Sequence, residues 1–128
     1  MTRILLKRVY EPAAPGDGFR ILVDRLWPRG MRKEALALDL WAKDAAPSTA
    51  LRQWYHADPG ERWPEFRKKY AGELLHSPAF SSFVLRIAHE PVVTLLYGAK
   101  DPDRNHAVVL RQQLENALAG VAAASTGA

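Results

Sequence analysis

Charged and aromatic side chains follow directly after the apolar run 19–23, and their types could bind an anion. The loop holds one acid, three arginines, a lysine, a tryptophan and a glycine: Asp24, Arg25, Trp27, Arg29, Gly30, Arg32 and Lys33. Arginine forks suit carboxylate or phosphate, Trp27 could supply a stacking face, and the glycine could allow a close backbone approach. In the structural alternative, Asp24 pairs with a neighbouring arginine to fix the loop and Trp27 caps the core.

A second polar loop follows the apolar run 92–97. Its candidate residues are Tyr97, Lys100, Asp101, Arg104, Asn105 and His106. A helix that begins near Asn105 would present unpaired backbone N–H groups and the positive end of its dipole, which favour phosphate or carboxylate. His106 at this helix start could act as an acid or base near neutral pH. In the alternative interpretation, Asn105 only caps the helix and His106 packs or bonds locally.

The two loops would form one pocket if they met at one edge of a sheet. Ligands of open α/β sheets collect beyond the carboxyl ends of the strands. In such a pocket Asp24 or His106 would transfer protons, and Arg25 or Arg29 would hold the anion. Lys43 could join them, although a lysine followed by an aspartate is also typical of a solvated strand end.

Several other kinds of site are absent from the sequence. There is no cysteine, which excludes a cysteine nucleophile, disulfides and thiolate metal sites. The four histidines lie far apart with no pair at i, i+4, so we expect no metal site. Neither a Gly-x-Ser-x-Gly elbow nor a glycine-rich phosphate loop is present. These residues therefore identify no cofactor.

Four apolar runs predict the strands that must position these loops. They cover residues 4–9, 19–23, 36–41 and 92–97. The second and fourth are apolar on both faces, as in central strands of an α/β sheet, whereas 36–41 alternates, as in a shorter strand with one buried face. The strand order stays open, and the first two strands could pair as a hairpin or lie apart.

Apolar stripes at helical spacing predict the helices that pack on the sheet. The first follows Ser48, a favoured N-cap residue. Because a proline inside a helix removes a hydrogen bond, we expect a separate turn at 59–62 and a regular helix that begins at Pro64. The remaining helices are expected at about 78–87 and 105–121.

These elements predict a single α/β domain over residues 1–121, with about four strands and four helices packed on the sheet. The tail 122–128 has nothing to bury and is expected to fray. No apolar run reaches the roughly 18 residues that a membrane helix needs, and the N-terminus lacks the pattern of a signal peptide. We therefore expect a cytoplasmic protein with no membrane partner.

A long tryptophan-containing string, Val23-Asp24-Arg25-Leu26-Trp27-Pro28-Arg29-Gly30, is specific enough to compare with known families. It is followed by Trp41-Ala42-Lys43, Ala46-Pro47-Ser48 and Asn105-His106-Ala107. Together these strings resemble the YeaO-like family, a bacterial domain of unknown function numbered 488. The resemblance covers residues 3–118 and implies no particular activity.

A broader group of similar domains often carries a cysteine after the strand that corresponds to 92–97, and a Cys-His-Arg string at the start of the next helix. In this chain Tyr97 takes the first place and Asn105-His106-Ala107 the second, so that only the histidine is retained. The resemblance therefore carries no thiol or metal chemistry over to this chain.

The formal net charge of +4 favours anionic partners. We expect a small domain that binds an anion or phosphate ligand, with enzymatic activity left open. The second hypothesis is a nucleic-acid-binding or regulatory module that uses the basic loop 25–33. The third is an interaction domain without chemistry, which would have well-paired loop charges and no pocket.

Overall fold

Within residues 2–126, which the computed structural model describes, the sheet has four parallel strands. They are β1 (Arg3–Arg8), β2 (Phe19–Leu22), β3 (Leu40–Trp41) and β4 (Val92–Tyr97), and their spatial order is β1-β4-β2-β3. Because β4 pairs with both β1 and β2, the first two strands lie apart rather than as a hairpin. The predicted α/β fold is confirmed.

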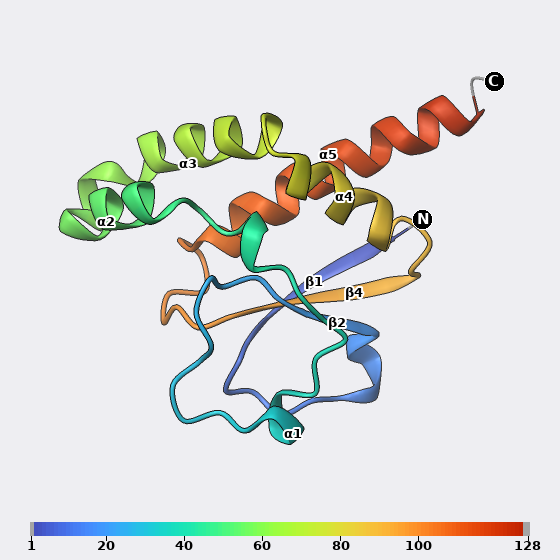
Figure 1. Cartoon of the computed structure of the whole chain (residues 1–128), viewed down its shortest axis with the longest axis horizontal. Helices are drawn as coiled ribbons and strands as arrows, with labels where there is room; N and C mark the ends of the chain where they lie inside the picture. Colours follow the sequence, from blue (N-terminus) through green and yellow to red (C-terminus); the bar gives the residue numbers. More distant parts are fainter. Residues whose placement is uncertain (1, 127–128) are drawn as a thin grey trace.

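Four helices cover one face of this sheet, among the residues that the structure describes (Figure 1). They are α2 (Thr49–Ala57), α3 (Pro59–Leu75), α4 (Pro78–Ile87) and α5 (His106–Thr126). The short helix α1 (Lys33–Leu36) lies on the other side of the sheet with the loops around it. The Ser48 hydroxyl accepts the Leu51 N–H at 3.2 Å, so the predicted N-cap of α2 is confirmed.

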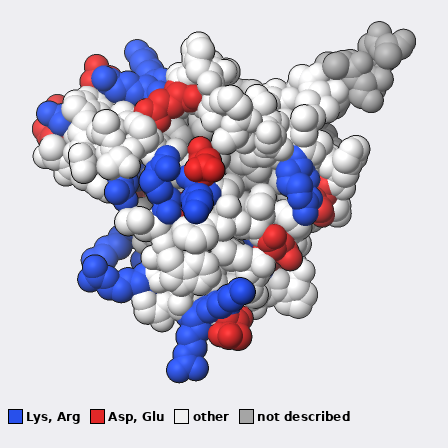
Figure 2. Space-filling model, in the orientation of Figure 1, with Lys and Arg blue, Asp and Glu red and all other residues white. Residues whose placement is uncertain are grey.

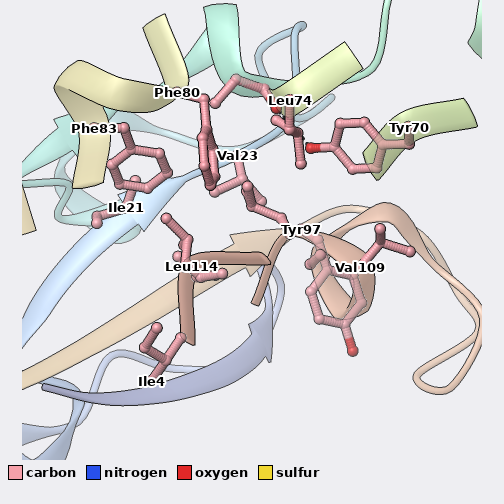
Figure 3. Close-up of a cluster of buried hydrophobic side chains, with 14 of the residues drawn as sticks. Ile4, Ile21, Val23, Tyr70, Leu74, Phe80, Phe83, Tyr97, Val109 and Leu114 are labelled. Carbon is pink, nitrogen blue, oxygen red and sulfur yellow. Dashed lines mark hydrogen bonds between the residues drawn. The ribbon is translucent and has the colours of Figure 1, made fainter. Parts of the chain in front are cut away.

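The main core fills the space between the sheet and these helices (Figure 3). Alternate residues of the strands point into it, as Ile21 and Val23 do beside Leu95. Aromatic side chains of α3 and α4, such as Tyr70 and Phe83, pack on them from above. Each fully buried large apolar side chain contributes about 1.5–3 kcal/mol, so this core holds α2 to α5 on the sheet.

A smaller core on the opposite face explains why the prediction of a strand over 36–41 is wrong at its beginning. Leu36 is fully buried there with Leu22 and Leu96, but it belongs to α1. Ala37 then has a φ of 48°, which breaks any extended run, and β3 begins only at Leu40. Leu36 and Leu38 therefore pack on the smaller core from a helical turn and a loop, and only Leu40 belongs to a strand.

A buried ionic cluster shares this second face, and we call Asp17, Lys7 and Arg20 the Asp17 cluster. The Asp17 carboxylate accepts hydrogen bonds from Lys7 Nζ at 2.9 Å, from the Ala14 N–H at 3.0 Å and from the Arg20 guanidinium. Arg20 donates further to the Leu36 carbonyl at 2.8 Å. Both Asp17 and Arg20 are only 5% exposed, so this face is closed by paired charges as well as by apolar contacts.

Helix α3 begins at Pro59, so the predicted turn at 59–62 is wrong. Pro59 takes the first helical position, where its missing N–H would have no helical partner. Pro64 lies inside the helix and removes one backbone hydrogen bond. Trp63 packs at a tilt on Tyr55 of α2 and Phe66 stacks on it, at centroid distances of 5.9 and 4.4 Å. This aromatic packing stabilises the first turns despite the proline.

Helix α5 extends to Thr126, past the expected domain boundary at residue 121. The expected frayed tail, 122–128, includes residues 127–128, which lie outside the described residues. In residues 2–126 no helix is long and apolar enough to cross a membrane.

Candidate functional site

The carboxyl ends of β2 and β4 meet at one edge of the sheet because the two strands are adjacent and parallel. Asp24 follows β2 and Gly98 follows β4, and the Gly98 N–H donates to Asp24 Oδ2 at 2.9 Å. A Cβ at position 98 would lie 2.9 Å from the same oxygen, so a larger residue there would displace the Asp24 carboxylate. The two polar loops therefore meet in space.

His106 connects the second loop to the first through one ring nitrogen. Its Nε2 lies 3.1 Å from the Val23 carbonyl oxygen and 2.9 Å from Asp24 Oδ1. Since both neighbours are acceptors, Nε2 carries a hydrogen. Only the contact with Val23 has hydrogen-bond geometry, and Asp24 Oδ1 is buried without a hydrogen-bond partner among the described residues. We call Asp24, Gly98 and His106 the Asp24 cluster.

A cavity of about 510 Å³ opens beside the Asp24 cluster. One wall is the face of α2 that carries Arg52, Tyr55 and His56, which share that face through spacings of three and four. The opposite wall is the loop 98–105. The lining comprises Asp24, Arg25, Leu26, Ala46, Pro47, Arg52, Tyr55, His56, Pro59, Phe66, Gly98, Ala99, Lys100, Asp101, Arg104, Asn105 and His106. The cavity has the size of a small-molecule site.

Hydrogen bonds order the loop that forms the second wall. Asp101 Oδ1 accepts the N–H groups of Asp103 and Arg104 at 2.8 and 3.1 Å, and these bonds lower the pKa of Asp101. Asn105 Nδ2 donates to the Asp101 carbonyl at 2.8 Å. Asn105 Oδ1 accepts the Val108 N–H at 3.1 Å and caps α5. These hydrogen bonds therefore order this wall without a ligand.

Arg25 holds the segment that leads into α2. Its Nη2 donates to the carbonyls of Ala46 and Pro47, both at 3.3 Å, while its buried Nε has no hydrogen-bond partner within the described chain. Glu73 of α3 fixes the next residue, because its carboxylate accepts the Ser48 N–H at 2.9 Å and the Ser48 hydroxyl at 2.5 Å. These contacts place α2 across the edge of the sheet.

Three further cations line the cavity and form no ion pair within the described chain, although Arg104 also lowers the pKa of the Asp101 carboxylate on the same loop. Over residues 2–126, the side chains of Arg52, Lys100 and Arg104 form no ion pair. Figure 2 shows basic side chains gathered on this face around α2 and the loop before α5. Unpaired positive charge around a hollow raises the local concentration of anions.

Tyr55 lies where the two walls approach each other. Burial raises the pKa of its phenol, the nearby Asp101 carboxylate raises it further, and Arg104 lowers it. Asp101 and Arg104 line the same cavity as Tyr55. Tyr55 is 8% exposed and stacks on Phe66, so it joins the main core to the cavity.

The predicted site residues that line the cavity are Asp24, Arg25, Lys100, Asp101, Arg104, Asn105 and His106. The others lie elsewhere, in two groups.

Trp27 and Lys33 line a separate depression with Trp41. The indole N–H groups of Trp27 and Trp41 donate to the carbonyls of Met31 and Asp24 at 2.9 and 2.8 Å. Lys43 Nζ lies 5.3 Å from the Trp41 ring centroid, in a cation–π contact rather than in the cavity. Trp27 and Lys33 therefore face a different part of the surface from the cavity.

Arg29, Gly30 and Tyr97 also lie outside the cavity lining. The Arg29 carbonyl accepts the Tyr10 hydroxyl at 3.2 Å. Gly30 has a φ of 79° with open space where a Cβ would be, so it serves a turn rather than a close approach. Tyr97 is 4% exposed in the main core, and its hydroxyl points away from the other labelled side chains (Figure 3).

Helix α2 contributes residues that the sequence analysis did not select: Arg52, Tyr55 and His56. A basic residue and a histidine at i, i+4 beside a tyrosine were a visible signal for a polar helix face. The position of that face depends on the contacts of Arg25 and Glu73, which join residues distant in sequence.

A family model and several known proteins match most of the chain. A family model described as the inactive DUF488-N3 subclade matches residues 3–127. The "Uncharacterized protein YeaO" of Escherichia coli (strain K12) is 46% identical over 113 residues, which are 88% of this chain and 97% of that protein. The "Uncharacterized protein Rv3073c" of Mycobacterium tuberculosis (strain ATCC 25618 / H37Rv) is 44% identical, over 88% of this chain and 94% of that protein.

No solved structure matches the chain. The family model and these relatives cover the strings that resembled the YeaO-like family, which confirms that resemblance. The chain belongs to the DUF488 family, within the subclade described as inactive.

Proposed function

We propose that the cavity beside the Asp24 cluster binds a small anionic ligand and does not convert it. The observation that carries this proposal is the set of three cations, Arg52, Lys100 and Arg104, which line the cavity and form no ion pair within residues 2–126. A carboxylate or phosphate would supply the missing acceptors through charge-assisted hydrogen bonds. The ordered loop 98–105 reduces the entropy that a ligand must offset on binding.

In this proposal, Asp24 and His106 position the loops and do not transfer protons. Asp24 Oδ2 is occupied by the Gly98 N–H, and His106 Nε2 by the Val23 carbonyl. These contacts use one carboxylate oxygen and one ring nitrogen to join the ends of β2 and β4 to the start of α5. A binding role fits a member of a subclade described as inactive.

Nucleic-acid binding ranks second. The basic side chains of loop 25–33 do not share one cavity, because Arg25 lines the cavity and Lys33 lines the depression beside Trp27. Nucleic-acid contacts of several basic residues weaken steeply with salt. A gel-shift series that shows tight, salt-sensitive binding would favour this second function.

A thermal-shift experiment tests the proposal. Pyrophosphate and citrate are compared with chloride at matched ionic strength, for the wild type, Arg104→Gln and the control Arg67→Gln, which changes an exposed arginine of α3 outside the cavity. Saturation at about 100 times Kd stabilises the folded state by about 2.7 kcal/mol, which raises Tm by roughly 10 °C for a domain of this size.

We expect this rise in the wild type and in Arg67→Gln, and a much smaller one in Arg104→Gln. Equal shifts in all three proteins, or no shift with either anion, would overturn the proposal.

A further inference from the structure

We infer that the ligand of this cavity joins its anionic group to an apolar body of one or two rings. The inference rests on the proposed anion binding and names the class of ligand: an aryl phosphate or an aryl carboxylate. It follows from the way in which apolar and charged residues are divided over the cavity lining.

The side of the cavity next to the core is apolar. Its buried residues are Ala46, Pro47, Tyr55 and Phe66, and the rings of the last two stack at 4.4 Å. Leu26 also lines the cavity and lies outside the main core. Leu26 is 62% exposed although it is one of the large apolar residues of the chain. Binding is favoured when a ligand removes apolar surface of this kind from water. A bare phosphate would leave these residues hydrated.

The cations lie on the two walls of the cavity. Arg52 projects from α2, three residues before Tyr55, while Lys100 and Arg104 belong to the facing loop. Arg104 and Tyr55 line the same cavity, so that the guanidinium and the apolar side share one space. An anionic group held between the walls would therefore have its apolar body directed to Leu26 and the Tyr55–Phe66 stack.

The volume supports a ligand larger than a single oxyanion. A cavity of about 510 Å³ falls within the roughly 300–1,000 Å³ of small-molecule sites, which are mostly apolar with a few placed polar groups. The lining of this cavity has both apolar and charged residues, and one aryl phosphate or aryl carboxylate would contact both kinds at once.

Calorimetric titration with three probes tests the inference: 1-naphthyl phosphate, inorganic phosphate and 1-naphthol. We expect 1-naphthyl phosphate to bind the wild type at least tenfold more tightly than either of the other two, since only this probe contacts both parts of the cavity. Leu26→Ser should remove most of that advantage and leave phosphate binding unchanged. Arg104→Gln should weaken both phosphates about tenfold and leave naphthol unchanged.

Matched controls are Leu85→Ser and Arg67→Gln. Leu85 is 67% exposed on α4 and does not line the cavity, and Arg67 is exposed on α3. Both controls should bind all probes as the wild type does.

The outcomes separate this inference from the proposed function. If phosphate binds through Arg104 but the naphthyl group adds nothing, the inference is overturned while anion binding stands. If naphthol binds as tightly as its phosphate and Arg104→Gln changes nothing, the cavity selects apolar ligands, and both claims are overturned. The absence of binding by any probe also overturns both.

Discussion

The two aspartates that flank β2 differ in how fully their carboxylates are hydrogen-bonded and paired within the protein. Asp17 precedes the strand and accepts hydrogen bonds from a lysine, an arginine and a backbone N–H, so the Asp17 cluster is closed. Asp24 follows the strand, has one oxygen bonded to Gly98, and leaves the other without a hydrogen bond among the described residues. Around it lie cations that form no ion pair among residues 2–126.

This difference separates a structural role from a binding role. In the Asp17 cluster every charge has a partner inside the protein, and stability alone accounts for it. At the Asp24 cluster the inner side chains fix the loops, but Arg52, Lys100 and Arg104 form no ion pair within residues 2–126. Cations that form no ion pair within the described chain therefore line a cavity at the carboxyl edge of the sheet.

The largest effect is expected from Asp17→Asn, which breaks the closed cluster. The change leaves the charges of Lys7 and Arg20 without their carboxylate, and Arg20 is 5% exposed. Breaking a buried ion pair in this way costs about 3–5 kcal/mol. Urea denaturation measures the free energy of unfolding, with Asp103→Asn in the exposed loop as the control. A loss below about 1 kcal/mol would contradict the claim that the buried charges of the Asp17 cluster depend on one another.

Asp24→Ala is expected to destabilise the protein less, by about 1–3 kcal/mol. It removes the acceptor of the Gly98 N–H and the carboxylate beside His106, and an unmade hydrogen bond of a buried group costs about this much. The same denaturation experiment measures it, with the exposed Asp44→Ala as the control. If Asp24→Ala cost more than Asp17→Asn, the ranking of the two clusters would be reversed.

The pH dependence of stability distinguishes the Asp17 cluster further. Burial raises the pKa of Asp17, but the hydrogen bonds from Lys7, Ala14 and Arg20 lower it more, and the folded-state pKa lies below the ordinary 3.8. The stabilisation is therefore fully present above pH 3.8 and is lost as the pH falls through the lower folded-state pKa. Each pKa unit of difference corresponds to about 1.4 kcal/mol.

Accordingly, the difference in stability between wild type and Asp17→Asn should shrink between pH 5 and pH 2, as measured by denaturation at each pH. A constant difference over this range would contradict the assignment.

The smallest effect on stability is expected at the cavity. Arg104→Gln should change the free energy of unfolding by less than about 0.5 kcal/mol, as most surface substitutions do, because its guanidinium makes no ion pair within residues 2–126. Thermal denaturation without ligand measures this. A loss above about 1 kcal/mol would mean that Arg104 is part of the fold and would weaken the contrast between the clusters.

Local sequence patterns predicted most of the elements, because buried faces repeat with the period of the helix or strand that carries them. The exceptions have local causes. Leu36 alternates with its neighbours like a strand residue but lies in a helical turn before Ala37, whose φ is 48°. Pro64 was expected to begin a helix, yet aromatic packing of Trp63 and Phe66 on Tyr55 extends α3 back to Pro59.

The site was predicted in part, because local patterns locate the residues that follow strands but not the contacts between distant segments. Asp24 and His106 could be selected because each follows a strand, and the parallel pairing of β2 and β4 brings those ends together. Arg52 and His56 could not be placed at the cavity, since α2 is positioned by contacts between residues far apart in the chain. Trp27 and Lys33, although close to Asp24 in sequence, face another depression.

Central to this account is the claim that an anion binds between α2 and the loop 98–105. Titration of the ¹⁵N-labelled protein with pyrophosphate, followed by amide chemical shifts at constant ionic strength, locates any binding directly. The account predicts saturable shifts at Gly98, Ala99, Asn105 and His56, which line the cavity, and none around Trp27. Shifts centred on Trp27 and Trp41, or no saturable shift at all, would contradict it.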